Sequence, residues 1–281
     1  MIIVPKEMSF QTLLESYHVS KPNIYKFKQE TFKAYRNNIL LKLNDLLNQN
    51  DEIYIESEPC DISLYSDSKE LKKVKIIYED DNILVVSKPR GIIIHEDGNT
   101  NRTLLNLMSY YLSKKGQDIK LRAIHRLDKD TTGLVLFTKN IVAHSYLDYQ
   151  MQNNFIIKNY LAKVEGSVLK DGIINKPIGR DRHHSNRYLV SETGKAALTK
   201  YKVIKRGAES LLDVEIKTGR THQIRVHLKS INHPIIGDAI YNPNSNENLC
   251  LHAYKIKFKN PMDQKDKELI CDADFYSETI N

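Results

Sequence analysis

One short stretch combines side chains that could perform chemistry with an apolar run that could hold them in place. His125, Arg126 and Asp128 lie within four positions, and Gly133 precedes the strand-like run Leu134–Phe137. An aspartate held ionised by an arginine can attack carbon and form a covalent intermediate. The same spacing is also typical of a solvated turn with a surface ion pair. These residues alone leave both interpretations open.

A second polar stretch, residues 217–228, places Arg220 and Arg225 where a predicted strand, 212–216, turns into a predicted helix. Thr221 is the predicted N-cap of that helix. Exposed backbone N–H groups beside two arginines favour an anion. The anion could be a phosphate or a carboxylate from elsewhere in the fold.

The histidines and cysteines form no familiar metal motif. His222 and His227 are five residues apart, whereas two ligands on one helix face are four apart. The pair His183 and His184 has no third ligand at a suitable spacing, and a basic loop that faces phosphate is the favoured interpretation there. The three cysteines are far apart, and there is no glycine-rich phosphate loop. We expect no metal and no cofactor.

Alternating and helical apolar patterns predict the elements that would position these residues. A hairpin is predicted over 74–87, helices over 104–113 and from Asn140 to about Met151, and a strand over 157–166 that carries Tyr160. Strands therefore outnumber helices, which predicts an α+β domain.

The order His125-Arg-Leu-Asp128, two residues, then Thr131-Thr-Gly133 and an apolar strand resembles the signature of the RluA-type pseudouridine synthases. These enzymes isomerise selected uridines in RNA. Thr132 stands where the family usually has serine. Further blocks follow in the family's order over about residues 74–262, including the sequence Thr-Gly-Arg-x-His-Gln-Ile-Arg that ends at Arg225.

The resemblance implies a mixed, largely antiparallel sheet with the site in a central cleft, and a role for several residues. Asp128 would be the nucleophile, and Tyr160 would stack on the flipped base or assist proton removal from C5. We hypothesise that Arg225 forms a bidentate pair with Asp128, which puts Arg220 nearer phosphate, although the opposite assignment stays open. Arg126 would fill the gap that the base leaves in the RNA. The predicted substrate-binding residues are Arg126, His125, Arg220, Thr131, Lys158, Ile224 and Arg180.

Residues 1–70 are predicted to form a small domain ahead of a catalytic domain, 71–281, with the polar stretch Ser66–Glu70 as linker. Basic and aromatic residues alternate within it, which suits RNA binding. The alternative is a solvated helix face with ordinary core aromatics. The order and spacing of residues in this segment resemble those of an S4-type RNA-binding domain in degenerate form.

The composition is compatible with these expectations. Lysine and arginine number 42 against 35 acidic residues, a net charge of +7 that modestly favours a polyanionic partner such as RNA. No apolar run reaches the roughly 18 residues of a membrane span, so we expect a cytoplasmic protein with no membrane partner. A monomer is the default expectation for the oligomeric state. Ribosomal RNA is favoured over transfer RNA as substrate, because an S4-like domain more often accompanies that use.

Two rival functions remain open at this point. The chain could be an RNA-binding or ribosome-assembly protein of the same fold that modifies nothing. It could also be an RNA hydrolase in which Asp128 and His125 act as acid and base. Hydrolysis would cut the RNA strand, whereas isomerisation leaves the backbone intact.

Overall fold

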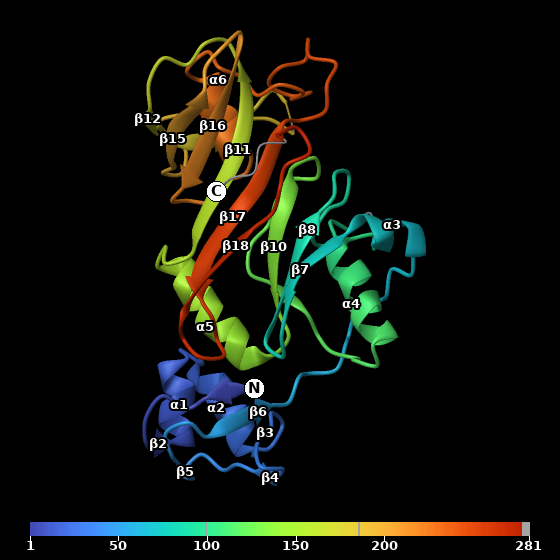
Figure 1. The fold of residues 1–281 in the computed structure, drawn as a ribbon, viewed down its shortest axis with the longest axis vertical. Helices are drawn as coiled ribbons and strands as arrows, with labels where there is room; N and C mark the ends of the chain where they lie inside the picture. The colour runs from blue at the N-terminus through green and yellow to red at the C-terminus, as the bar shows by residue number, and fades with distance from the viewer. Residues whose placement is uncertain (99, 185, 277–281) are drawn as a thin grey trace.

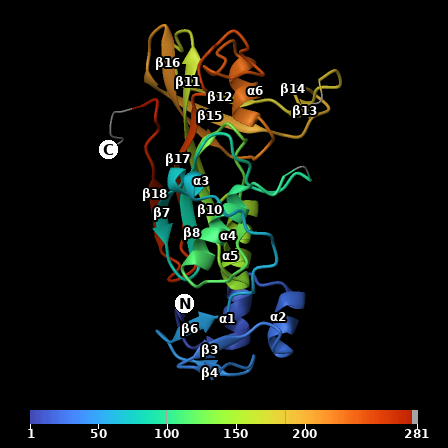
Figure 2. The ribbon, with the colours of Figure 1, turned by 90° about the vertical axis from the view of Figure 1, so that its right-hand side faces the viewer.

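The computed structural model describes residues 1–98, 100–184 and 186–276. The molecule is elongated, with a small N-terminal unit at one end and a long twisted sheet that extends to the other end (Figure 1). The view turned by 90° shows that the β13–β14 hairpin projects from the body (Figure 2).

A single large sheet, ten-stranded in the described residues, forms most of the larger part. Its order is β12-β15-β16-β11-β17-β10-β8-β7, with β18 beside β17 and β9 beside β10. The described pairs are antiparallel apart from β10 and β17, which run parallel. The predicted α+β class with a mixed, largely antiparallel sheet is therefore confirmed. The strands are β7 (Lys75–Glu79), β8 (Ile83–Lys88), β9 (Arg122–Ala123), β10 (Thr132–Thr138), β11 (Ile157–Glu165), β12 (Gly172–Asn175), β15 (Leu198–Lys205), β16 (Glu209–Ile216), β17 (Leu251–Lys259) and β18 (Asp266–Ile270), and the separate hairpin is β13 (Ile178–Arg180) with β14 (Tyr188–Val190).

Two of the predicted helices of the larger part, 104–113 and 140–151, are confirmed, and each begins after a capping side chain. Asn140 accepts a hydrogen bond from the Ala143 N–H at the start of α5, and Thr103 caps α4 in the same way. Among the described residues no helix has both the length and the apolar character needed to cross a membrane. The helices are α3 (Ser68–Lys73), α4 (Leu104–Lys114), α5 (Ile141–Gln152) and α6 (Gln223–Lys229).

Helices α4 and α5 cover opposite faces of the sheet where β8 and β10 pair. Successive side chains of a strand point to opposite faces. Leu84 and Val86 belong to the apolar cluster that contains α4, whereas Ile83 and Val85 pack with Leu147 of α5. The two helices therefore flank these strands, as Figure 1 shows.

Gly133 lets three strands meet next to the site. It lies inside β10, one residue after the strand begins, with a φ of +111° rather than at a bend before the strand. It pairs with Lys88 of β8 on one side and with Ala253 of β17 on the other. A Cβ atom here would lie 2.3 Å from the Ala253 carbonyl oxygen. Only glycine therefore allows β17 to approach β10 this closely.

The N-terminal unit has an apolar core of its own, in which α1 and α2 pack with short strands. Phe27 and Phe32, two of the aromatics considered for RNA contact, are buried in it, while Tyr25 is 55% exposed. The core-aromatic alternative therefore holds for the two phenylalanines. The S4-like character of the unit stays a prediction. Its elements are β1 (Ile2–Ile3), β2 (Met8–Ser9), α1 (Phe10–Ser16), α2 (Lys21–Lys28), β3 (Ala34–Arg36), β4 (Ile39–Leu40), β5 (Leu46–Leu47) and β6 (Glu52–Ile55).

Helix α5 joins this unit to the larger part. Its residues Ile141, Val142 and Tyr146 belong to the same apolar cluster as the N-terminal core. The Tyr17 hydroxyl also donates a hydrogen bond to the Pro261 carbonyl, at 2.7 Å. The two parts therefore share buried surface.

The predicted linker, Ser66–Glu70, overlaps helix α3, because the Asp67 side chain caps the backbone N–H groups that follow it. The segment before it lies against the larger part, where Glu58 pairs with Arg122 at 2.5 Å. A boundary near residue 70 stays a prediction.

Replacing Gly133 by alanine should destabilise the fold severely. Left-handed strain costs about 1–3 kcal/mol, and overpacking adds about 1–3 kcal/mol. Chemical denaturation would measure the loss of unfolding free energy. Gly116→Ala is the matched control, since Gly116 also has a positive φ, +75°, but has open space around it. Equal losses in both variants would contradict the role of the close strand approach.

Candidate active site

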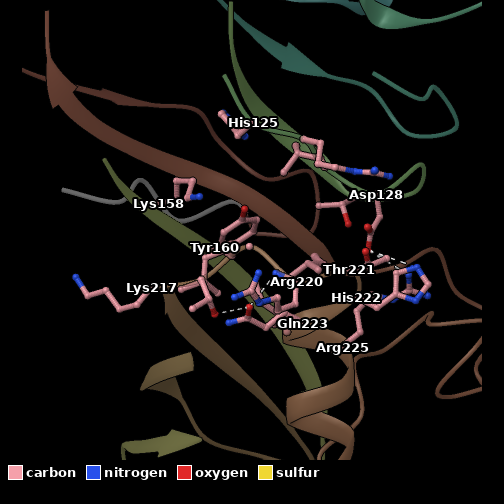
Figure 3. Close-up of a pocket in the computed structure, with 18 of the residues that line it drawn as sticks. His125, Asp128, Lys158, Tyr160, Lys217, Arg220, Thr221, His222, Gln223 and Arg225 are labelled. Carbon is pink, nitrogen blue, oxygen red and sulfur yellow. Dashed lines mark hydrogen bonds and ion pairs between the residues drawn. The ribbon is translucent and has the colours of Figure 1, made fainter. Parts of the chain in front are cut away.

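A cleft of about 300 Å³ lies where the loop before β10 faces β11 and the start of α6 (Figure 3). Arg180, in β13, does not belong to its lining. Most of the predicted site residues therefore line the cleft, although they come from segments that are far apart along the chain. The predicted site residues that line it are His125, Arg126, Asp128, Thr131, Lys158, Tyr160, Arg220, Ile224 and Arg225.

The loop that carries Asp128 is held from β8 by Lys88, which is not among the predicted site residues. The Lys88 side chain is buried, and its Nζ atom donates hydrogen bonds to the carbonyls of Pro89, Ile92 and Lys129, at 3.0, 2.9 and 2.8 Å. Burial lowers the pKa of Lys88 to about 7. The three carbonyls are acceptors for all three ammonium protons, so Lys88 ties the end of β8 to the residue after Asp128.

Arg225 has its bidentate partner in Asp238, so the hypothesis of a bidentate pair with Asp128 is wrong. Its Nε and Nη2 atoms each donate to one oxygen of Asp238, both at 2.8 Å. The fully buried Asp238 also accepts hydrogen bonds from the N–H groups of Ile240 and Tyr241. Burial opposes the charge of Arg225, but the hydrogen bonds and charge of Asp238 outweigh it and raise the Arg225 pKa.

Asp128 accepts a hydrogen bond from the third guanidinium nitrogen of Arg225. Arg225 Nη1 lies 3.3 Å from Asp128 Oδ2, and His222 Nε2 lies 3.8 Å from the same oxygen. Arg220, the other candidate, donates through Nε to the Ala196 carbonyl. The geometry therefore agrees with the prediction that Arg225, rather than Arg220, pairs with Asp128. Figure 3 shows Asp128 facing the start of α6 across the cleft.

Helix α6 begins one residue later than predicted, so Thr221 as its N-cap is wrong. The cap position is His222, whose φ of +57° and ψ of 18° are left-handed. The Gln223 side chain instead accepts hydrogen bonds from the Thr218 hydroxyl and the Arg220 N–H, at 2.7 and 3.1 Å. The His222 side chain makes no capping hydrogen bond.

Tyr160 and Lys158 lie on β11 at the floor of the cleft. Burial, together with the nearby charge of Asp128, raises the pKa of Tyr160, which therefore stays a neutral phenol near pH 7. Burial lowers the pKa of Lys158 to about 8. Its Nζ atom lies 3.4 Å from the Met151 sulfur.

His125 is not placed to work with Asp128. Its Nε2 atom accepts a hydrogen bond from the Leu136 N–H at 3.3 Å, and it lies apart from Asp128 in Figure 3. Burial lowers the pKa of His125 to about 3, so the ring is neutral. A hydrolase with His125 and Asp128 as acid and base therefore finds no support in this geometry.

The other predicted residues occupy simpler positions. Arg126 is exposed at the cleft. The Thr131 N–H donates to the Asp128 carbonyl at 3.2 Å and closes the loop, and Ile224 is buried in the first turn of α6. Within the described ranges no group of three His, Cys, Asp or Glu side chains could hold a metal ion.

Comparisons with known proteins agree on one family. The sequence model described as RNA pseudouridylate synthase matches residues 82–230. The uncharacterized RNA pseudouridine synthase YhcT of Bacillus subtilis is 37% identical, with 97% of this chain and 91% of that protein covered. The ribosomal large subunit pseudouridine synthase D of Buchnera aphidicola is 32% identical, with 84% of this chain and 81% of that protein covered.

A solved structure supports the fold alone. Human RNA pseudouridylate synthase domain containing 1 superposes with a TM-score of 0.61 at 24% identity, covering 73% of this chain and 86% of that chain. The two proteins therefore share a fold over these portions of their chains.

Replacing Asp238 by asparagine should cost about 3 kcal/mol or more of unfolding free energy, because it leaves the buried Arg225 guanidinium without its full counter-charge. Denaturant unfolding is the measurement. The matched control is Asp266→Asn, which removes an exposed ion pair with Lys257 and should cost at most about 0.5 kcal/mol. Unchanged stability of the Asp238 variant would show that the pair does not hold this part of the fold.

Proposed function

This chain belongs to the RNA pseudouridylate synthase family, and we propose that Asp128 is the nucleophile with which it isomerises uridine. The resemblance found in the sequence motifs is thereby confirmed at the level of the family. The enzyme is an isomerase that acts on RNA. Pseudouridine formation breaks the N1–C1′ bond, turns the uracil and joins C5 to C1′, while the C5 proton is lost and N1 gains one.

The single observation that carries the proposal for Asp128 is its place opposite Arg225. The carboxylate lies in the cleft with one oxygen, Oδ2, at 3.3 Å from the guanidinium. A hydrogen bond from a fixed guanidinium holds the carboxylate oxygen in place, and an aspartate held in this way can act as a nucleophile toward carbon. Arg225 is itself fixed by Asp238, so it holds this position without help from the substrate.

Tyr160 is proposed to stack on the flipped uracil rather than to remove the C5 proton as a phenolate. Its raised pKa keeps it protonated near pH 7, and its ring lines the cleft beneath Asp128. A stacked aromatic ring compensates the base for the stacking that it loses on leaving the RNA.

The remaining site residues are proposed to bind RNA. Arg126, exposed beside Asp128, would fill the space that the flipped base leaves, and Arg220 would lie nearer phosphate. His125, Thr131, Lys158 and Ile224 would shape the cleft around the base. Arg180, outside the cleft, would contact the RNA backbone from β13.

Ribosomal RNA is the proposed substrate, in preference to transfer RNA. The name of the Buchnera aphidicola relative refers to the large ribosomal subunit, and residues 1–70 are proposed as an S4-like RNA-binding domain. We further propose a monomer that works in the cytoplasm, where such RNA is made.

Pseudouridine mapping of total RNA should identify the target and test the nucleophile together. Cells that lack the gene should lose particular adduct-dependent reverse-transcription stops. Wild type should restore these stops, and Asp128→Asn should not, because an amide cannot attack carbon as a carboxylate does.

RNA binding by purified Asp128→Asn is the control, and it should be retained. Restoration of the stops by this variant would reject Asp128 as nucleophile. If no stop changes in any strain, the non-modifying RNA-binding alternative becomes the better explanation.

A further inference from the structure

A chain of hydrogen bonds leads from the β13–β14 hairpin to His222 beside Asp128. The backbone N–H of Tyr188, the first residue of β14, donates to the Tyr241 hydroxyl at 2.9 Å. That hydroxyl lies 3.0 Å from His222 Nδ1. His222 Nε2 then faces Asp128 Oδ2, at 3.8 Å. None of the roles proposed above uses this series of hydrogen bonds.

The hydrogen atoms in this series of hydrogen bonds determine which ring nitrogen of His222 carries the proton. The Tyr241 oxygen already accepts a hydrogen bond from Tyr188, so its own hydrogen is available for His222 Nδ1. A neutral imidazole that accepts at Nδ1 carries its hydrogen on Nε2. The Nε2–H group therefore points toward Asp128.

The surroundings keep both rings in these forms. Burial raises the pKa of Tyr241 to about 12, so its hydroxyl stays protonated. Burial lowers the pKa of His222, which also faces Asp128 and Asp238 as opposing charges and Arg225 and Arg126 as like charges. The imidazole is thus neutral near pH 7.

The backbone of His222 indicates that its orientation is enforced. A left-handed conformation is unfavourable for a residue with a side chain and persists only when its surroundings impose it. Here the edges of two aromatic rings confine the imidazole, with centroid distances of 5.6 Å to Tyr188 and 5.7 Å to Tyr241. Its side chain is only 14% exposed, which leaves little of it for contact with RNA.

The two groups nearest to the Asp128 carboxylate both lie near the same oxygen. Arg225 and His222 both face Oδ2, which is also the oxygen that accepts the hydrogen bond from Arg225. Two donors on one oxygen fix the rotation of a carboxylate and leave the other oxygen available to attack. Contacts of this kind in free enzymes are often long and shorten when the substrate binds.

We propose that His222 is a positioning residue, which Tyr241 orients so that its Nε2–H and Arg225 together hold Oδ2 of Asp128 and leave Oδ1 as the attacking oxygen. This inference rests on the proposed role of Asp128 as nucleophile. The loss of such an orienting partner typically lowers activity by about 10–100-fold.

The test compares His222→Asn with His222→Gln. Asparagine tolerates the left-handed backbone but is too short to reach Asp128, whereas glutamine can place an N–H group near the position of Nε2. Both are assayed for the single-turnover rate of pseudouridine formation in RNA from cells that lack the gene, and for RNA affinity.

His222→Asn should slow the single-turnover step by about 10–100-fold with unchanged RNA affinity, and His222→Gln should recover part of the rate. Tyr241→Phe keeps the aromatic ring and should also slow the step, because His222 then loses the group that fixes its tautomer. His233→Gln, beyond the end of the same helix, is the control and should match wild type. Thermal unfolding of each variant verifies that it is folded.

Each remaining outcome has a definite meaning. Wild-type rates in His222→Asn and Tyr241→Phe, with Asp128→Asn inactive, would overturn the positioning role and leave the proposed function standing. A loss of RNA affinity that matches the loss of rate would make His222 an RNA contact instead. An active Asp128→Asn would reject the nucleophile itself. If His222→Asn does not fold, the rates of Tyr241→Phe and His222→Gln decide.

Discussion

The buried ion pair between Arg225 and Asp238 is the interaction on which the site depends. A buried guanidinium is costly unless a carboxylate matches its geometry and charge. Asp238 does so with both oxygens, and backbone N–H groups further fix one of these oxygens. Arg225 is consequently a fixed cation before any substrate arrives, and Asp128 meets it with a single hydrogen bond. Asp238 therefore holds the arginine in place, whereas Asp128 is bound to it only through one hydrogen bond.

The loop of Asp128 is positioned from the opposite side by backbone constraints. Lys88 ties this loop to the end of β8, and Gly133 brings β10 close to β17 directly after it. The Asp128 carboxylate therefore lies between two supports, the centre of the sheet and the first turn of α6. A preorganised site of this kind spends little free energy on rearrangement when the substrate binds.

The sequence predicts which residues gather in the cleft better than it predicts how they pair. Periodicity and capping residues identify α4, α5 and the sheet, because these signals are local. Asp128 and Arg225 follow from motif resemblance. The partner of Arg225 does not, since Asp128 and Asp238 are both acidic and only tertiary structure shows which one faces the guanidinium fork. The sequence likewise does not reveal the structural roles of Lys88 and Gly133, because their partners are carbonyls and a backbone on distant segments.

Helix α5 contributes apolar side chains to two cores at once. Ile141, Val142 and Tyr146 are buried with the N-terminal unit, and Leu147 is buried under the sheet. Removing the first part of the chain would expose a continuous apolar surface on this helix, so the two parts are thermodynamically coupled. Unfolding of either part would weaken the other, and the chain should therefore melt as one cooperative unit rather than as two independent domains. The position of the N-terminal unit relative to the cleft is then set by the packing of α5 against both apolar clusters.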